Sequence, residues 1–465
     1  MSGSNDLTQA EWRLTDFVHG FDASHAPEEA LAVVRNMLLT TLGTAIAGAS
    51  EDGCAAILDF VRERDRSGGA TVFIHGDSVS ASGAALVNGV MCRALDFCDA
   101  MAPGLHVGSS LIPAALAAVE LAGGCSGRDF LSALLIGAEV ASRMNLAETD
   151  YDGADPTGVA GVFGATAAVA RILGLDRQQT LHSLALALNR AAGSFQSNID
   201  GSLAVRLIQG WVAETGVMCA QLAQRGITGP GRFLSGVYGY AHQFARGLRK
   251  ADEFVEGLGE QWQVMSTVFK KYPSCGLTQG VTELALRARK ELDIGPGNVG
   301  RIEVRLPPYA FRLVGHDFVI GENPRVNAQF SAKYCVANAL VRGASRLEHF
   351  VESSIRDPEV LAFTGRVDVI SDETMQALHH TAVEFHVEAA DGRRLKLALD
   401  IAPGFPGNAL PAQAHLARFT DCLQYAAKPV SGQQANQLVQ IVNTIQEQDD
   451  AHAILSHMQV GRGGA

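Results

Sequence analysis

The stretch VNGVMCRALDFCDAMAPGLHVGSSLIPAALAAVE, residues 87–120, is the part of the chain from which its organisation can be worked out. Two apolar, alanine-rich runs with helical spacing flank a short polar island. The island holds Asp96, Asp99 and His106, and Pro103 and Gly104 break the chain between the two acids and the histidine. A loop with such breakers lets two helix ends converge. A carboxylate and an imidazole are groups that commonly transfer protons in enzymes. The alternative is a capped helix end with a solvated histidine.

Composition limits the class of protein and its partners. The chain has 465 residues, of which 47% are hydrophobic and 18% charged, so two or three domains with a large buried core are expected. The formal net charge of -12 argues against nucleic acid or an anionic membrane as a partner. A small anionic substrate is still compatible with this charge, because a local arginine or lysine pocket can oppose the global sign.

The cysteines and the apolar runs predict a cytoplasmic protein. None of the eight cysteines forms a C-x-x-C pair, which argues against a zinc ribbon or a redox dithiol and fits a reducing compartment. The N-terminus is polar and lacks an apolar signal core. Charged, polar and glycine residues interrupt every apolar run, so no membrane span is expected.

The patterning changes twice along the chain. Residues 1–265 have helical periodicity, apart from the polar island and a short β-rich run at 71–81, and predict a helical domain. Residues 266–403 predict a smaller α+β domain, and residues 404–465 predict helices that return to the first domain. The fold class expected is therefore mainly α, with a large all-helical domain and a smaller α+β domain.

Four local patterns define the α+β domain. Ile302, Val304 and Leu306 alternate on one face of a strand, and residues 327–343 predict one helix. A further strand is expected within 366–373. Residues 381–403 predict two strands joined at Asp391-Gly392, a strong hairpin signal.

A glycine repeat follows Asp155. Gly158, Gly161 and Gly164 recur every three residues, which lets helices approach closely. The spacing is not that of a dinucleotide-binding fingerprint, and no parallel-strand unit precedes it. No organic cofactor is expected here.

Several polar groups interrupt otherwise apolar segments. A cleft between the two domains would collect them, and small-molecule sites often lie in such clefts. These groups are Asp96, His106, Asp155, Thr157 and Arg206 from the helical part, and Lys270, Lys271, Tyr272, Cys275, Lys333 and Tyr334 from the α+β part.

Taken together, several segments resemble the MmgE/PrpD family, which includes 2-methylcitrate dehydratase, cis-aconitate decarboxylase and iminodisuccinate epimerase. The resemblance covers nearly the whole chain and implies a helical domain with a smaller α+β lid, a homodimer, no metal or organic cofactor, and chemistry beside a carboxylate. The segments that carry it are VNGVMCRALDFCDA, LHVGSSLIPAALAAVE, DPTGVAGVFGATAAVARILGLD, DGSLAVRLIQGWVAETGVMCAQLAQRGITGP, KKYPSCGLTQG, QFSAKYCVANAL and DPEV.

The resemblance implies roles for individual residues. Asp96 matches the first acid of the family's DFDD-type motif, and His106 matches the histidine downstream of it. Lys271 and Cys275 match the lysine and the cysteine of the lysine-tyrosine-proline segment, and Tyr334 matches a tyrosine of the lid helix.

The departures from the family pattern shape the functional hypothesis. Cys98 replaces the second acid of the motif, and Ala100 replaces the threonine that usually follows it. Asp155 begins a loop in which relatives have histidine-proline-threonine-glycine, and Val205 stands where relatives have a lysine. A histidine expected near Gln279 is also absent.

These losses favour the simpler reaction within the family. Expelling hydroxide needs a general acid as well as a base, whereas inverting a carbon beside a carboxylate needs only two proton-transfer groups and cations that stabilise the enolate. The hypothesis is an epimerase of a dicarboxylate resembling iminodisuccinate epimerase. The alternatives are a hydro-lyase like 2-methylcitrate dehydratase, a decarboxylase like cis-aconitate decarboxylase, a non-catalytic binding protein and a helical scaffold.

Specific residues are assigned to this hypothesis. His106 pairs with Lys271 or Tyr334 for proton transfer, and Asp96 orients His106. Each assignment has a structural alternative: Asp96 caps a helix, Tyr334 is a core aromatic with a satisfied hydroxyl, and one of the two adjacent lysines is solvated. The residues expected to bind substrate are Arg206, Lys270, Asp155, Thr157, Cys275 and Gln279, and no metal ligands are expected; Cys275 also fits a small packed side chain.

Overall fold

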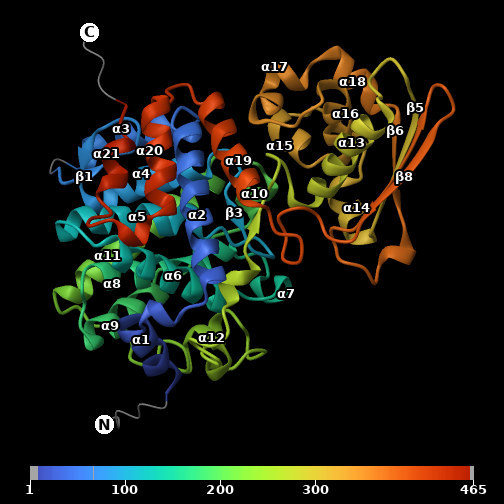
Figure 1. Cartoon of the computed structure of the whole chain (residues 1–465). Helices are drawn as coiled ribbons and strands as arrows, with labels where there is room; N and C mark the ends of the chain where they lie inside the picture. Colours follow the sequence, from blue (N-terminus) through green and yellow to red (C-terminus); the bar gives the residue numbers. More distant parts are fainter. Residues whose placement is uncertain (1–8, 66–67, 461–465) are drawn as a thin grey trace. The chain divides into compact units, whose positions relative to one another are not determined.

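Two compact units make up the chain. The computed structural model describes residues 9–65 and 68–460 (Figure 1). Unit 1 contains the chain up to Ala94, Cys98–Thr267 and the chain from Ala426, and unit 2 contains Leu95–Phe97 and Val268–Tyr425. The three residues Leu95–Phe97 therefore belong to a different unit from the residues on either side of them.

Unit 1 is built mainly from helices. The small strands β1 (Ala70–Thr71) and β2 (Ser78–Val79) form an antiparallel pair around the β-rich run, and β3 (Asp99–Ala100) lies in the polar island. The helices are α1 (Ala10–Gly20), α2 (Glu28–Gly48), α3 (Cys54–Arg64), α4 (Ala81–Arg93), α5 (Gly108–Ala122), α6 (Gly127–Met144), α7 (Glu148–Tyr151), α8 (Val162–Ile172), α9 (Arg177–Leu188), α10 (Gln196–Ile199), α11 (Ala204–Gln224), α12 (Tyr240–Gln243), α20 (Gly432–Asn443) and α21 (Ala453–His457).

Close helix packing forms the core of unit 1. Helix α11 packs against α4, α5 and α8, α5 packs against α4 and α8, and α6 packs on α8. A Cβ placed on Gly164 of α8 would lie 2.4 Å from the carbonyl oxygen of Gly137 on α6, so these two helices approach to backbone contact. The glycine repeat therefore serves helix packing at this position, as its spacing predicts.

Helix α2 corrects one expectation. Its 21 residues are long and apolar enough to cross a membrane, although the sequence was expected to contain no such run. Within the described residues, 72% of its most apolar 18-residue window is buried in the protein. This burial is that of a core helix.

Unit 2 contains a four-stranded mixed sheet. The strand order is β6-β5-β7-β8, with β5 parallel to β6 and antiparallel to β7. The strands of the unit are β4 (Val268–Phe269), β5 (Val299–Leu306), β6 (Val367–Ser371), β7 (Val383–Ala389) and β8 (Arg394–Leu399). Its helices are α13 (Gln279–Leu292), α14 (Pro308–Val314), α15 (Pro324–Gln329), α16 (Ala332–Arg342), α17 (Glu352–Ile355), α18 (Pro358–Thr364) and α19 (Ala412–Tyr425).

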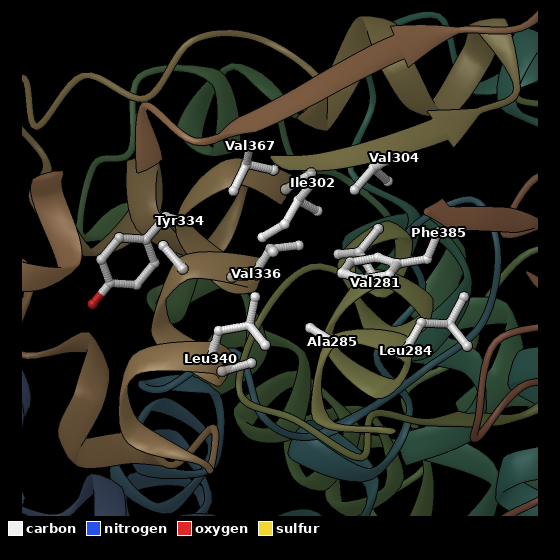
Figure 2. Close-up of a cluster of buried hydrophobic side chains, with 14 of the residues drawn as sticks. Val281, Leu284, Ala285, Ile302, Val304, Tyr334, Val336, Leu340, Val367 and Phe385 are labelled. Carbon is white, nitrogen blue, oxygen red and sulfur yellow. The ribbon is translucent and has the colours of Figure 1, made fainter. Parts of the chain in front are cut away.

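The core of unit 2 lies between the sheet and two helices. Figure 2 shows side chains from α13 and α16 meeting side chains from β5, β6 and β7. Ile302, Val304 and Leu306 are fully buried, which confirms the predicted alternation. The predicted hairpin is confirmed as well, since the Gly392 N–H donates to the Ala389 carbonyl in the turn between β7 and β8.

Two features of unit 2 differ from the sequence prediction. The single helix expected over residues 327–343 is two helices, because Ser331 caps the start of α16 by accepting a hydrogen bond from the Tyr334 N–H. Helix α19 belongs to unit 2, whereas the sequence pattern groups residues 404–465 with the helical domain.

Candidate active site

The imidazole of His106 is held in one tautomer by the polar island of unit 1. Its Nδ1 lies 2.8 Å from the carbonyl oxygen of Asp99 and 3.3 Å from Sγ of Cys98. A carbonyl oxygen can only accept a hydrogen bond, so Nδ1 carries the proton and Nε2 is the nitrogen that gains and loses one. The ring is half-buried, and its expected role in proton transfer stays a prediction.

Asp99 fixes the loop that carries His106. Its buried carboxylate accepts hydrogen bonds from the Gly108 N–H at 3.0 and 3.2 Å, at the start of α5, where the helix dipole favours a negative charge. Met101 and Leu105 exchange two backbone hydrogen bonds of 2.7 and 2.9 Å across the turn. Asp99 belongs to the polar island but carries no individual role in the sequence prediction, because spacing alone does not distinguish local anchoring from solvation.

Asp155 and Thr157 support the same loop. The Asp155 carboxylate accepts hydrogen bonds from the N–H groups of Thr157 and Gly158, and the Thr157 hydroxyl accepts one of 3.0 Å from the His106 N–H. Burial raises the pKa of Asp155, although these N–H donors favour its charged form. Thr157 also begins a π-helical turn, a type often found at functional sites. Their assignment to substrate binding stays a prediction.

Arg206 lies at the start of α11 in unit 1. Its Nη1 donates a 2.6 Å hydrogen bond to the carbonyl of Asp52, at the turn before α3. This contact ties the start of α11 to that turn. The expected role of Arg206 in binding a substrate carboxylate stays a prediction.

A buried ion pair forms in unit 2. Nζ of Lys270 lies 2.9 Å from Oδ2 of Asp96 and donates a 2.8 Å hydrogen bond to the Asp96 carbonyl. The two side chains are 6% and 19% exposed. Asp96 has a φ of 52°, a left-handed conformation that is uncommon for residues with a side chain but that aspartate adopts more often than most. That Asp96 also orients His106 stays a prediction.

The two adjacent lysines have different partners. Nζ of Lys271 lies 2.6 Å from Glu283, whose carboxylate also accepts a 2.6 Å hydrogen bond from the Tyr272 hydroxyl. The Lys271 side chain is 33% exposed, whereas that of Lys270 is 6% exposed. Lys270 is therefore the more enclosed of the two, and Lys271 is partly exposed but paired with Glu283.

Tyr334, expected to be catalytic, lies in the hydrophobic core of unit 2 (Figure 2). The side chain is fully buried between Phe318 and Phe350, and its hydroxyl donates a 2.6 Å hydrogen bond to the His349 carbonyl. Burial raises the pKa of Tyr334 to about 12. These contacts match the alternative of a core aromatic with a satisfied hydroxyl, and they give the catalytic assignment no support.

Gln279 and Cys275 shape the loop after Lys270. The amide of fully buried Gln279 exchanges hydrogen bonds with the backbone of Tyr272 and also donates to the Ser274 carbonyl, so it holds the loop. Its assignment to substrate binding stays a prediction. Burial raises the pKa of the Cys275 thiol to about 11, which makes it a poor nucleophile. Gln329, which the sequence analysis missed, donates to the Pro273 and Leu95 carbonyls at 3.0 and 3.4 Å.

Two sets of polar side chains emerge from these contacts. The His106 set of unit 1 comprises His106, Cys98, Asp99, Asp155 and Thr157, and the Lys270 set of unit 2 comprises Lys270, Asp96, Cys275, Gln279 and Gln329. Lys271 is paired with Glu283, the Tyr334 hydroxyl with the His349 carbonyl, and Arg206 with the Asp52 carbonyl. Within residues 9–65 and 68–460, no three His, Cys, Asp or Glu side chains are grouped to hold a metal ion. The prediction that all these groups share one cleft stays a prediction.

Family models match most of the chain. The model of the MmgE/PrpD N-terminal domain matches residues 12–251, and that of the MmgE/PrpD C-terminal domain matches residues 272–444.

Individual relatives are similar over most of their length. A human cis-aconitate decarboxylase is 23% identical over 451 residues, which cover 94% of this chain and 92% of the relative. A cis-aconitate decarboxylase-like protein of Aspergillus oryzae is 26% identical, over 84% of this chain and 86% of its own. A mouse cis-aconitate decarboxylase is 25% identical, over 75% of this chain and 73% of its own.

Proposed function

Because the chain belongs to the MmgE/PrpD family, we propose that it is a lyase that decarboxylates an unsaturated tricarboxylate of the cis-aconitate type. The observation that carries this proposal is its similarity, over up to 94% of its length, to relatives named as cis-aconitate decarboxylases. The relatives support the lyase alternative of the sequence analysis better than the epimerase that was its main hypothesis.

The contacts in both units also favour a reaction with one proton-transfer group. An epimerase needs two such groups, one for each face of the carbon. Of the partners expected for His106, Tyr334 has its hydroxyl engaged by a backbone carbonyl and Lys271 is paired with Glu283. Decarboxylation needs a single proton delivered after carbon dioxide has left, and one imidazole suffices for that.

The proposed reaction breaks one C–C bond and forms one C–H bond. The C–C bond to the carboxylate on the saturated arm breaks and carbon dioxide leaves. The electron pair moves through the double bond to the carbon beside another carboxylate, and that carbon takes up one proton to give methylenesuccinate. The imidazolium form of His106 supplies this proton from Nε2, while the Asp99 carbonyl holds Nδ1–H.

In this proposal the Lys270 set binds a carboxylate of the substrate and stabilises the negative charge that develops on it. A buried ammonium group binds a carboxylate strongly and stabilises the dienolate that forms as carbon dioxide departs. Asp96 fixes the ammonium through its carboxylate and its backbone carbonyl. Arg206 is retained as a second cation for a substrate carboxylate.

Proton NMR in deuterated water tests the proposal. The purified protein is incubated separately with cis-aconitate, 2-methylcitrate and single stereoisomers of iminodisuccinate. We expect new vinyl protons from cis-aconitate and release of carbon dioxide. We also expect one deuterium on the saturated carbon of the product, the carbon that takes up the proton. His106→Gln is the inactive control, because an amide does not supply a proton at neutral pH.

Each other result contradicts the decarboxylase. Consumption of 2-methylcitrate with cis-aconitate unchanged identifies a dehydratase. Deuterium at an α-carbon of iminodisuccinate with formation of the opposite stereoisomer identifies an epimerase. No change in any substrate, from protein that is folded, excludes these three activities.

Two further expectations remain part of the proposal. We place the protein in the cytoplasm, because all eight cysteines are free thiols, and we expect a homodimer from the resemblance to the family.

A further inference from the structure

Helix α19 presents a buried polar stripe within unit 2. His415 and Arg418 are each 5% exposed and Cys422 is 2% exposed, whereas Gln413 and Thr420 on the same helix are exposed. Residues three, four and seven positions apart share one side of a helix, so the three buried side chains form a single stripe. Two ionisable side chains that are this deeply buried need specific partners.

Arg418 contacts the residue after Asp96. Its Nη2 donates a 2.8 Å hydrogen bond to the Phe97 carbonyl, and its guanidinium carbon lies 4.6 Å from the centre of the Phe97 ring. The same group therefore holds both the backbone and the side chain of Phe97. Asp96 itself has a φ of 52°, a conformation that persists only where the surroundings enforce it.

His415 contacts the residue before Lys270. Its ring lies edge-on to Phe269, with the ring centres 4.8 Å apart. Burial and the neighbouring Arg418 lower the pKa of His415 to about 4, so the imidazole is neutral at physiological pH and adds no third cation beside Arg418 and Lys270. Its Nδ1 has no hydrogen-bond partner in the part of the chain that the structure describes.

One helix face thus holds both segments that bring the ion pair together. We propose that α19 is the positioning element of the Asp96–Lys270 pair, with Arg418 fixing the segment of Asp96 and His415 packing on the segment of Lys270. The effect on catalysis rests on the proposed function, since it assumes that the Asp96–Lys270 pair acts on the substrate. The sequence spacing gave no sign of it, because Arg418 lies 321 residues after Phe97.

Variants of Arg418, measured alone and in a double-mutant cycle with Asp96, test the predicted effect of α19 on turnover. Arg418→Met removes the donor and the cation but keeps an unbranched side chain, and Arg418→Lys restores the charge. We expect Arg418→Met to lower kcat about 10- to 100-fold with a smaller change in KM, because a small misplacement of a catalytic group has effects of this order. Arg418→Lys recovers part of the loss, and Gln413→Ala on the exposed side of α19 has no effect.

The background Asp96→Asn distinguishes positioning from a general loss of stability. If Arg418 acts through Asp96, the effect of Arg418→Met on kcat shrinks to less than about twofold in this background. An equal effect in both backgrounds shows that Arg418 does not act through Asp96 and overturns the inference.

Amide hydrogen exchange gives a readout that needs no activity. We expect exchange of residues 95–98 and 268–270 to become on the order of tenfold faster in Arg418→Met, with the strands β5 and β7 unchanged. Unchanged exchange in both segments overturns the inference. If Arg418→Met does not fold, Arg418→Lys and His415→Gln are measured by the same criterion. A wild-type protein that leaves cis-aconitate untouched refutes the proposed function, while the exchange result still decides the role of α19.

Discussion

Two neighbouring lysines offer the sharpest test at the scale of single residues. Lys270 is buried against Asp96, and Lys271 is half-exposed against Glu283. We predict that Lys270→Met lowers kcat/KM on the order of 100-fold, as the loss of one group that stabilises negative charge does. Lys271→Met is the matched control, and we expect its kcat/KM to stay within about fivefold, because the Lys271 ammonium is partly exposed and solvent weakens its ion pair.

Steady-state kinetics of both variants with cis-aconitate provides the measurement. Two equal losses would remove the distinction drawn from burial. A larger loss in Lys271→Met would restore the assignment that the sequence resemblance implied.

The hydroxyl of Tyr334 is predicted to matter for stability and not for activity. It donates a hydrogen bond to the His349 carbonyl from within the core. Tyr334→Phe keeps the ring and its contacts, so we expect the unfolding free energy to fall by about 1 kcal/mol with kcat within about twofold. Urea unfolding and turnover are measured on the same preparation. A loss of turnover of more than about tenfold without a matching loss of stability would return Tyr334 to the catalytic residues.

At the scale of elements, a buried ion pair anchors the segment that leads out of unit 1. Arg143 on α6 is paired at 2.6 Å with Glu139, one turn earlier, and both side chains are at most 2% exposed. Arg143 also donates to the Gly257 and Gln261 carbonyls, and Glu139 accepts from the N–H groups of Gln263 and Val264. One helix therefore fixes the loop over these residues.

Removing one partner of this pair is predicted to destabilise unit 1 strongly. Arg143→Met leaves the Glu139 carboxylate buried without its cation, and we expect the unfolding free energy to fall by about 3–5 kcal/mol. Tryptophan fluorescence in urea reports on this unit, since Trp12, Trp211 and Trp262 all belong to it. Arg62→Met is the control, because Arg62 is 46% exposed and its ion pairs contribute at most about 1 kcal/mol. Similar midpoints for the two variants would contradict the anchoring role.

At the scale of the whole molecule, local patterns were predicted and distant pairings were not. The alternation at Ile302 and Val304 and the turn at Asp391-Gly392 depend on adjacent residues, so the sequence alone indicates them. The partner of Lys270 depends on where the chain returns after more than 170 residues, and the enclosure of Tyr334 depends on the packing of a whole core. Resemblance could assign these residues to a family pattern, but only their contacts separate a site residue from a core residue.

The two units are predicted to respond differently to acid. In unit 2, burial lowers the pKa of His349 and of His415 to about 4, below the unfolded value of 6.5. The folded unit then binds fewer protons than the unfolded chain between these values, so its unfolding free energy falls as the pH falls, by about 2 kcal/mol for each histidine at pH 5. Asp421, whose pKa is raised by burial, offsets part of this loss. In unit 1, burial raises the pKa of Glu139 and Asp155, so their contribution to stability grows on acidification, and the pKa of His75, which burial lowers, offsets part of this gain.

Urea titrations at pH 7 and pH 5 measure this difference within one chain. Tryptophan fluorescence follows unit 1, and hydrogen exchange of the strands β5 and β7 follows unit 2. We expect the midpoint of unit 2 to fall more than that of unit 1. His415→Gln is uncharged at every pH, so it reduces the fall in unit 2, whereas the same change at exposed His452 does not. Equal shifts in both units, or an unchanged fall in His415→Gln, would show that the buried histidines do not control the acid stability of unit 2.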